Sequence, residues 1–117
     1  MKKTKAELEN EISASVAGFL DEQMGEHARS VTAFLSGNTI TVRATHCLSP
    51  GEKMLVRDEE GWRLFKEFKN QQFEKVKSHL QARLEKVTAS KVLDVVSVLG
   101  QNGVRFELVT LNRNFES

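Results

Sequence analysis

The stretch from residue 60 to residue 88 constrains this chain more than any other feature, because it contains no proline and no glycine after Gly61. Its mixture of charged and apolar residues predicts one long helix. At roughly 1.5 Å per residue, such a helix measures about 43 Å. A domain of this size has a diameter of roughly 35 Å, so the helix must overhang its own domain, bend, or lie along a partner.

The apolar residues of this helix fall into two phases. At about 100° per residue, one stripe contains Trp62, Phe73, Val76, Leu80, Leu84 and Val87. Lys66 and Lys69 fall inside that stripe, whereas Leu64, Phe65 and Phe68 centre on an arc displaced by roughly 100°. We therefore expect two segments joined near residues 69–72, one packed on the chain's own sheet and the other facing a second subunit.

Two capping patterns mark the starts of other helices. Thr4 and Glu7 form a capping box, and the apolar spacing that follows predicts a helix over about residues 4–24. Ser49 and Glu52, with a proline directly after the serine, have the same pattern and predict a short helix.

Two hairpins complete the predicted fold. Residues 30–36 and 39–45 alternate apolar and polar positions around a Gly-Asn turn, and residues 91–99 and 104–111 are rich in Val and Leu. We expect an α+β fold with the order α-ββ-α-α-ββ, in which an antiparallel four-stranded sheet packs against the long helix. A length of 117 residues predicts one domain, spanning residues 1–117.

Composition narrows the classes of function. The net charge of +1 argues against a strongly basic nucleic-acid binder. The single cysteine cannot form an internal disulfide, which fits a reducing compartment. The basic N-terminus leads into glutamates instead of an apolar segment, and no run approaches the roughly 20 apolar residues that cross a bilayer. We expect a cytoplasmic protein that does not span the membrane.

Cys47 is the candidate nucleophile, because a helix start just after it could lower the pKa of the thiol. A small buried apolar side chain explains Cys47 more simply, since no base is placed by the sequence. His46 beside it makes a poor metal pair, because adjacent strand residues point to opposite faces. Phosphate loops, hydrolase elbows and dinucleotide fingerprints are absent from the sequence. We expect no catalytic residue, no metal and no cofactor, and hence no enzyme.

The long helix carries an excess of basic residues, which could contact phosphate groups of nucleic acid or lipid. A solubilising helix face explains them more simply. The candidates for a basic surface are Arg63, Lys66, Lys69, Lys75 and Lys77.

The strand at 91–99 has apolar residues on both faces. Alternation places Val92, Val96 and Val98 on one face and Leu93, Val95 and Leu99 on the other. A sheet with one face exposed to solvent does not need apolar residues on both faces, so a helix or a second subunit should cover the extra apolar surface. The candidate partner or dimer contacts are Leu64, Phe65, Phe68, Val92, Val96 and Val98.

Several short motifs resemble the MpsC family, small bacterial proteins named for a sodium-translocating, membrane-potential-generating system. The matching motifs are Leu8-Glu9, Glu11-Ile12, Phe19, Gly25, Ile40-Thr41-Val42-Arg43, Leu48-Ser49-Pro50-Gly51-Glu52, Glu60-Gly61 and Val109-Thr110-Leu111-Asn112-Arg113-Asn114. The chain departs from the family at the turn after Gly25, at the Gly37-Asn38 turn and at Lys69. The resemblance spans nearly the whole chain, transfers no catalytic residue, and implies an accessory role near cation or bicarbonate transport.

These observations favour a non-enzymatic accessory or regulatory protein-interaction module that forms a homodimer and binds a subunit of a membrane system. The alternative is a nucleic-acid-binding regulator that uses the basic face of the long helix. A third hypothesis is a small-molecule sensor with a pocket near Trp62 and Phe65, although these aromatic residues are more simply core.

Overall fold

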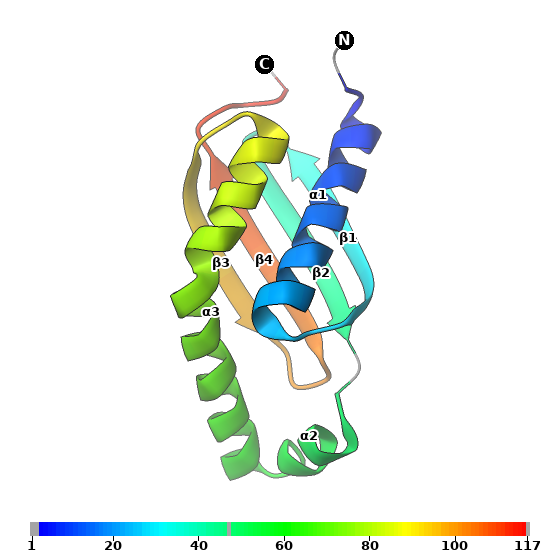
Figure 1. The fold of residues 1–117 in the computed structure, drawn as a ribbon, viewed down its shortest axis with the longest axis vertical. Coiled ribbons are helices and arrows are strands. Elements are labelled where there is room, and N and C mark those ends of the chain that lie inside the picture. The colour runs from blue at the N-terminus through cyan, green and yellow to red at the C-terminus, as the bar shows by residue number, and fades with distance from the viewer. Residues whose placement is uncertain (1–2, 47, 117) are drawn as a thin grey trace.

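In the part of the chain that the structure describes, a four-stranded antiparallel sheet carries two helices on one face and none on the other (Figure 1). The computed structural model describes residues 3–46 and 48–116, with the backbone alone at His46. The strands are β1 (Ala28–Ser36), β2 (Thr39–His46), β3 (Val92–Leu99) and β4 (Val104–Leu111), in the sheet order β1-β2-β4-β3. Both hairpins, the antiparallel sheet and the element order α-ββ-α-α-ββ are as the sequence predicts. Cys47 and the side chain of His46, which were weighed for chemistry, lie outside the described parts.

The first helix, α1 (Lys5–Phe19), begins with the predicted capping box at Thr4 and continues into a π-helical turn, η1 (Leu20–Met24). Gly25 ends this turn in the left-handed conformation, with φ of 64°. The amide of Glu26 then donates to the carbonyl of Leu20 at 2.9 Å. This tight reversal directs the chain into β1 and places Glu26 in the interior, where it is 2% exposed.

The helices α2 (Pro50–Leu55) and α3 (Glu59–Thr88) form a corner at one end of the molecule (Figure 1). Asp58 caps α3 by accepting from the amide of Gly61 at 2.7 Å. Gly61 is required at the corner, because a Cβ atom there would lie 1.8 Å from the carbonyl oxygen of Leu55. The molecule measures 49 × 23 × 21 Å, since the first half of α3 extends beyond the sheet. Of the three alternatives for this helix, the overhang is therefore present.

Apolar residues form two clusters between the helices and the inner face of the sheet. The larger one joins α1, the second half of α3 and the sheet, and includes the edge-to-face pair Phe19–Phe73. The smaller one joins Val56, Phe65 and Leu99, with Leu48 and Trp62 packed against it. Phe65 thus belongs to the packed interior, as the simpler interpretation predicts, and Trp62 is partly buried against it.

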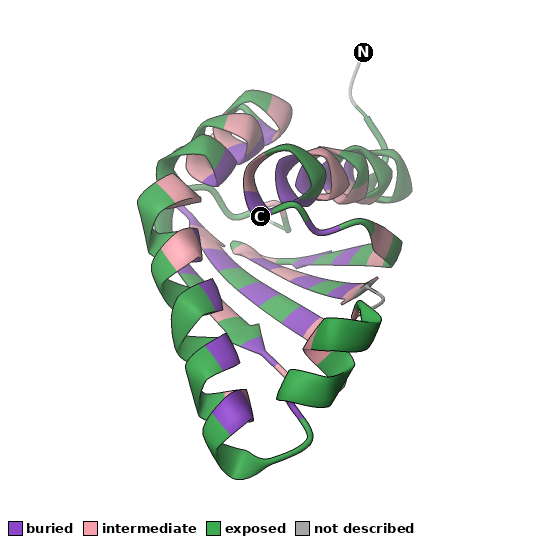
Figure 2. Cartoon of the chain, turned by 60° about the horizontal axis from the view of Figure 1, so that its bottom comes forward, coloured by how far each residue is buried: buried purple, intermediate pink, exposed green. Residues whose placement is uncertain are grey.

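The two halves of α3 do face different neighbours, but the prediction of two separate buried stripes is wrong. The buried positions run continuously along the helix (Figure 2). They are Gly61, Phe65, Lys69, Phe73, Leu80, Leu84 and Thr88. Steps of four residues advance by about 40°, so the stripe winds around the helix as its neighbours change. Lys69 belongs to this stripe because its ammonium group pairs with an acidic residue buried inside the fold.

The assignment of Val92 and Leu93 to faces of β3 is also wrong. A bulge between Val92 and Asp94 shifts the register, so that Val92 pairs with Leu111 and turns inward, while Leu93 is 63% exposed. After the bulge, Val95 and Leu99 point to the core and Val96 and Val98 point outward. An extra residue in one strand reverses the alternation on either side of it.

Candidate functional site

The face of the sheet opposite α1 and α3 is unusually apolar, and we call it the open face. Buried and exposed positions alternate along the strands (Figure 2), so the outward residues of all four strands share this face. Its large apolar side chains, with their exposed fractions, are Phe34 56%, Val96 45%, Val98 51%, Phe106 39% and Leu108 43%. An antiparallel sheet with one wet face normally carries polar residues there. Exposed apolar patches of this kind mark interaction sites.

The strand register gathers most of these side chains on β3 and β4. Val96 lies opposite Leu108, and Val98 lies opposite Phe106. Cross-strand neighbours of this kind are in contact range, so these four residues form one continuous apolar patch. Residues that pair across neighbouring strands form a row across the sheet. Phe34 lies in the same row as Leu108, but Thr41 lies between them.

The remaining outward positions are mainly serines and threonines of β1 and β2. Among the paired outward positions of the described strands only Arg43 and Asp94 are charged. Arg43 donates to the hydroxyl of Thr45 at 3.4 Å, and neither charge forms an ion pair with another described residue. A nearly uncharged face with two charges of opposite sign suits a protein surface better than a phosphate backbone.

The structure does not bring the six expected contact residues together. Val96 and Val98 lie on the open face. Leu64 and Phe68 are exposed, but they lie on the overhanging half of α3. Phe65 is buried in the smaller cluster, and Val92 is half-buried against the larger one, so neither is available to a partner.

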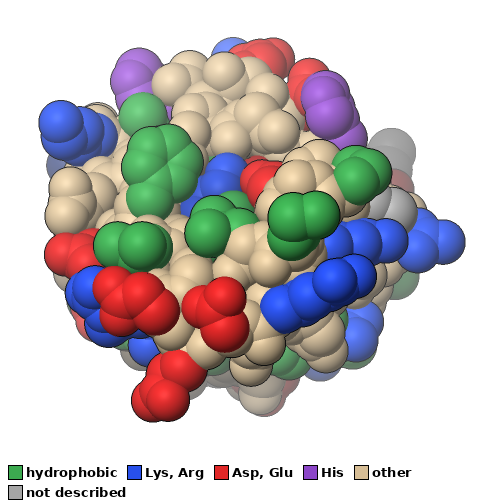
Figure 3. Space-filling model, turned by 90° about the horizontal axis from the view of Figure 1, so that it is seen from below, with side chains coloured by type: hydrophobic (Ala, Val, Ile, Leu, Met, Phe, Trp, Pro, Cys, Tyr) green, Lys and Arg blue, Asp and Glu red, His purple; other side chains and the backbone are tan. Residues whose placement is uncertain are grey.

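A second group of exposed apolar side chains surrounds the α2–α3 corner. Its members are Met54, Leu55, Leu64 and Phe68. Seen from this end, hydrophobic side chains surround a hollow with a basic and an acidic group at its bottom (Figure 3). A cavity of ≈ 370 Å³ opens here, lined by Gly25, Glu26, His27, Leu48, Ser49, Glu52 and Lys69. Ser49 and Glu52 already satisfy each other in the capping box of α2.

A cluster of four charged residues is buried between the two apolar clusters. Glu26 accepts from Arg105 Nε at 3.0 Å and Nη2 at 2.8 Å, and it lies 3.3 Å from Lys69 Nζ. Glu107 accepts from the hydroxyl of Ser97 at 3.1 Å and lies 3.9 Å from Arg105 Nη1. Buried charges persist where they are paired in this way.

Burial raises the pKa of the Glu107 carboxyl to about 7, although Arg105 and Ser97 favour its charged form. Its Oε2 atom accepts no hydrogen bond from the described residues. The loss of water around the carboxylate therefore outweighs the nearby guanidinium. The carboxyl changes charge near neutral pH, but a structural charge cluster gives this behaviour as readily as a catalytic one.

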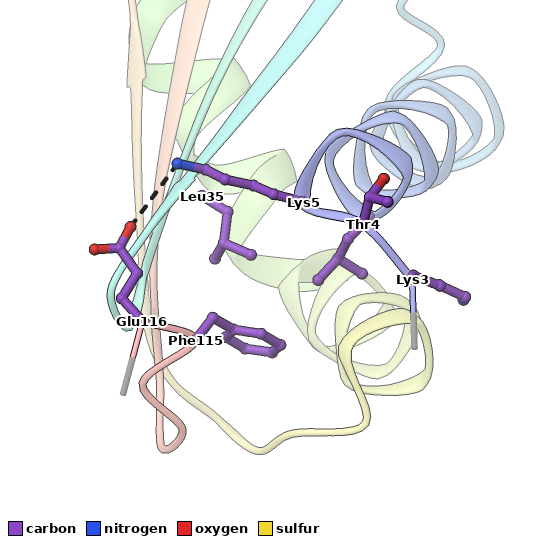
Figure 4. Close-up of a pocket in the computed structure, with 7 residues that line it drawn as sticks. Lys3, Thr4, Lys5, Leu35, Phe115 and Glu116 are labelled. Carbon is purple, nitrogen blue, oxygen red and sulfur yellow. Dashed lines mark ion pairs between the residues drawn. The ribbon is translucent and has the colours of Figure 1, made fainter. Parts of the chain in front are cut away.

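A smaller cavity lies where the two ends of the described chain meet (Figure 4). It measures ≈ 120 Å³, and Lys5 and Glu116 lie 3.8 Å apart at its edge. Its other walls are the apolar side chains of Leu8, Leu35 and Phe115 with Lys3 and Thr4. These lining residues do not pair a nucleophile with a base.

The predicted basic surface on α3 is largely neutralised. Arg63 pairs with Glu60 at 2.6 Å and with Glu67 at 3.3 Å, and Lys77 pairs with Glu74 at 3.2 Å. Lys69, expected on this surface, is buried beside Glu26. Lys66 lies 5.8 Å from the ring of Trp62, and Lys75 is exposed. The helix thus does not present a continuous basic stripe.

Sequence reasoning missed Phe34, Phe106, Leu108 and the Arg105–Glu107 pair. In β4 the apolar Phe106 and Leu108 point outward while Arg105 and Glu107 point inward, the reverse of the usual pattern. The alternation along β4 carried a detectable signal. Val109 and Leu111 point inward, and the same alternate positions, counted back along the strand, are those of Glu107 and Arg105. Glu26, which receives Arg105, is too distant in sequence for a local pattern to reveal.

Among residues 3–46 and 48–116, no group of three His, Cys, Asp or Glu side chains could hold a metal ion. The exposed His27 lies with its Nδ1 atom 2.5 Å from Oδ1 of Asp21. Within the same residues, no helix combines the length and apolar character needed to cross a membrane.

Comparisons with known proteins agree with the motif resemblance. The chain is 28% identical over 121 residues to the uncharacterized protein YbcI of Bacillus subtilis (strain 168), an alignment that covers 99% of this chain and 98% of that protein. No solved structure matches. The family model described as "Na+-translocating membrane potential-generating system (MpsC)" matches residues 4–113. The chain therefore belongs to the MpsC family.

Proposed function

We propose that this protein is a non-enzymatic accessory module that acts by binding other protein chains, with a second copy of itself on the open face. The observation that carries this proposal is the continuous apolar patch of Val96, Val98, Phe106 and Leu108 on the face of the sheet that none of the described helices covers. Burial of such side chains between two sheets would stabilise a dimer by about 25 cal/mol for each Å² removed from water. The family name supports a further partner, a subunit of a sodium-translocating, membrane-potential-generating system.

The mass of the protein in solution, measured by light scattering at high micromolar concentration, tests the proposal. We expect the wild type to have twice the chain mass of 13.2 kDa. Leu108→Glu places a charge at the centre of the patch and should raise the dissociation constant by at least about 100-fold. Phe68→Glu is the matched control, because Phe68 is an exposed apolar residue on the other surface. A monomeric wild type, or a dimer disrupted by Phe68→Glu alone, would refute the proposal.

A further inference from the structure

Arg43 and Asp94, the charged residues at the paired outward positions of the described strands, are placed symmetrically about Leu108. Arg43 lies on β2, next to Leu108's strand, in the row of Phe106. Asp94 lies on β3, on the other side of β4, in the row of Thr110. With strands about 4.8 Å apart and rows about 6.8 Å apart, each Cα lies about 8 Å from that of Leu108, in opposite diagonal directions.

From this placement we infer that two copies pack open face to open face about a two-fold axis at Leu108, with Arg43 of each copy paired to Asp94 of the other. This inference rests on the proposed function, since it assigns the geometry of the proposed dimer. A two-fold interface is self-complementary, so a contact between two different residues occurs twice. The axis lies in the plane of the interface, passes through Leu108 and is perpendicular to the line from Arg43 to Asp94. Rotation about it places Arg43 of one copy opposite Asp94 of the other and Leu108 opposite Leu108.

The same axis brings the apolar patch into register with itself. Phe106 of each copy falls over Val96 of the other, beside the central pair of leucines. The strands of the two sheets cross at about 70°, which is closer to the orthogonal than to the aligned class of sheet packing. The result is an apolar centre with two ion pairs at its sides, the usual arrangement of a protein interface. It also gives a partner to both charges that lack an ion pair within the described chain.

Charge reversal tests this geometry separately from the existence of the dimer. Arg43→Glu sets two carboxylates against each other at both symmetric contacts, and Asp94→Arg sets two guanidinium groups against each other there. We expect each variant alone to raise the dimer dissociation constant by about tenfold at low salt, because both symmetric contacts change. An equimolar mixture of the two variants should restore affinity to near the wild-type value. In the mixed dimer, one contact pairs the two introduced charges and the other pairs the two native ones, so both are attractive. The readout is sedimentation equilibrium of one fluorescently labelled variant with its unlabelled counterpart.

Arg57→Glu is the matched control, since Arg57 is exposed outside the sheet. Circular dichroism checks that each variant is folded. If a charge-reversed variant does not fold, the neutral variants Arg43→Gln and Asp94→Asn take its place. Each neutral variant should weaken the dimer less than a charge reversal. A wild-type dimer with no gain on mixing would overturn the two-fold pairing and leave the proposed function intact. A monomeric wild type would overturn both.

Discussion

Glu26 accepts hydrogen bonds from a buried arginine and lies beside a buried lysine. The variant Glu26→Gln therefore tests how much this buried charge contributes to the free energy of unfolding. The amide is almost the same size as the carboxylate but carries no charge. It would leave Arg105 and Lys69, which are 1% and 7% exposed, without their shared anion. Removing one partner of a buried ion pair costs about 3–5 kcal/mol of unfolding free energy. Glu107 offsets a part of this loss, because its carboxylate lies 3.9 Å from Arg105 Nη1.

Urea unfolding monitored by circular dichroism at pH 8, where the Glu107 carboxyl with its pKa of about 7 is mostly ionised, measures the effect, and we expect a loss of about 3 kcal/mol with an unchanged urea m-value. Glu22→Gln is the matched control. Glu22 pairs with Arg83 at 2.5 Å, but its side chain is 61% exposed. We expect the control to cost less than about 1 kcal/mol. If the two variants lose the same small amount, water screens the inner cluster and the argument from burial fails.

Two further predictions concern the stability of the fold. The pKa of Glu107 is raised to about 7, so the native state holds a proton that the unfolded chain releases near pH 4.5. Stability should therefore fall as the pH rises from about 5 to 8, by up to about 3 kcal/mol, and Glu107→Gln should remove this part of the dependence in urea titrations at both pH values. An identical pH dependence in the variant would contradict the assignment. Gly61→Ala should cost at least about 2 kcal/mol in thermal unfolding, because its Cβ would overlap the carbonyl of Leu55. Gly51→Ala, which meets no atom within 4 Å, should be close to neutral; equal losses would refute the steric argument.

Local signals were sufficient for the elements of this fold. Thr4 with Glu7 and Ser49 with Glu52 form the predicted capping boxes, and Gly37-Asn38 forms the predicted hairpin turn. These patterns act over a few residues, through backbone donors that must be satisfied and conformations that only some residues adopt. The candidate contacts depended on long-range packing and were predicted less well, as the burial of Phe65 and Lys69 shows.

The sequence by itself determined that this chain forms an α+β fold with one long helix, because hydrophobic period and capping chemistry are properties of neighbouring residues. Only the tertiary structure decided which face of the sheet stays open and which charges are buried. A single bulge at Leu93 reverses the faces of β3, and Glu26 reaches Arg105 from 79 residues away. A charge can enter the interior only where a partner from elsewhere in the chain meets it. The pairing of Glu26 with Arg105 places Arg105 and Glu107 on the inner face of β4 and leaves Phe106 and Leu108 on the open face.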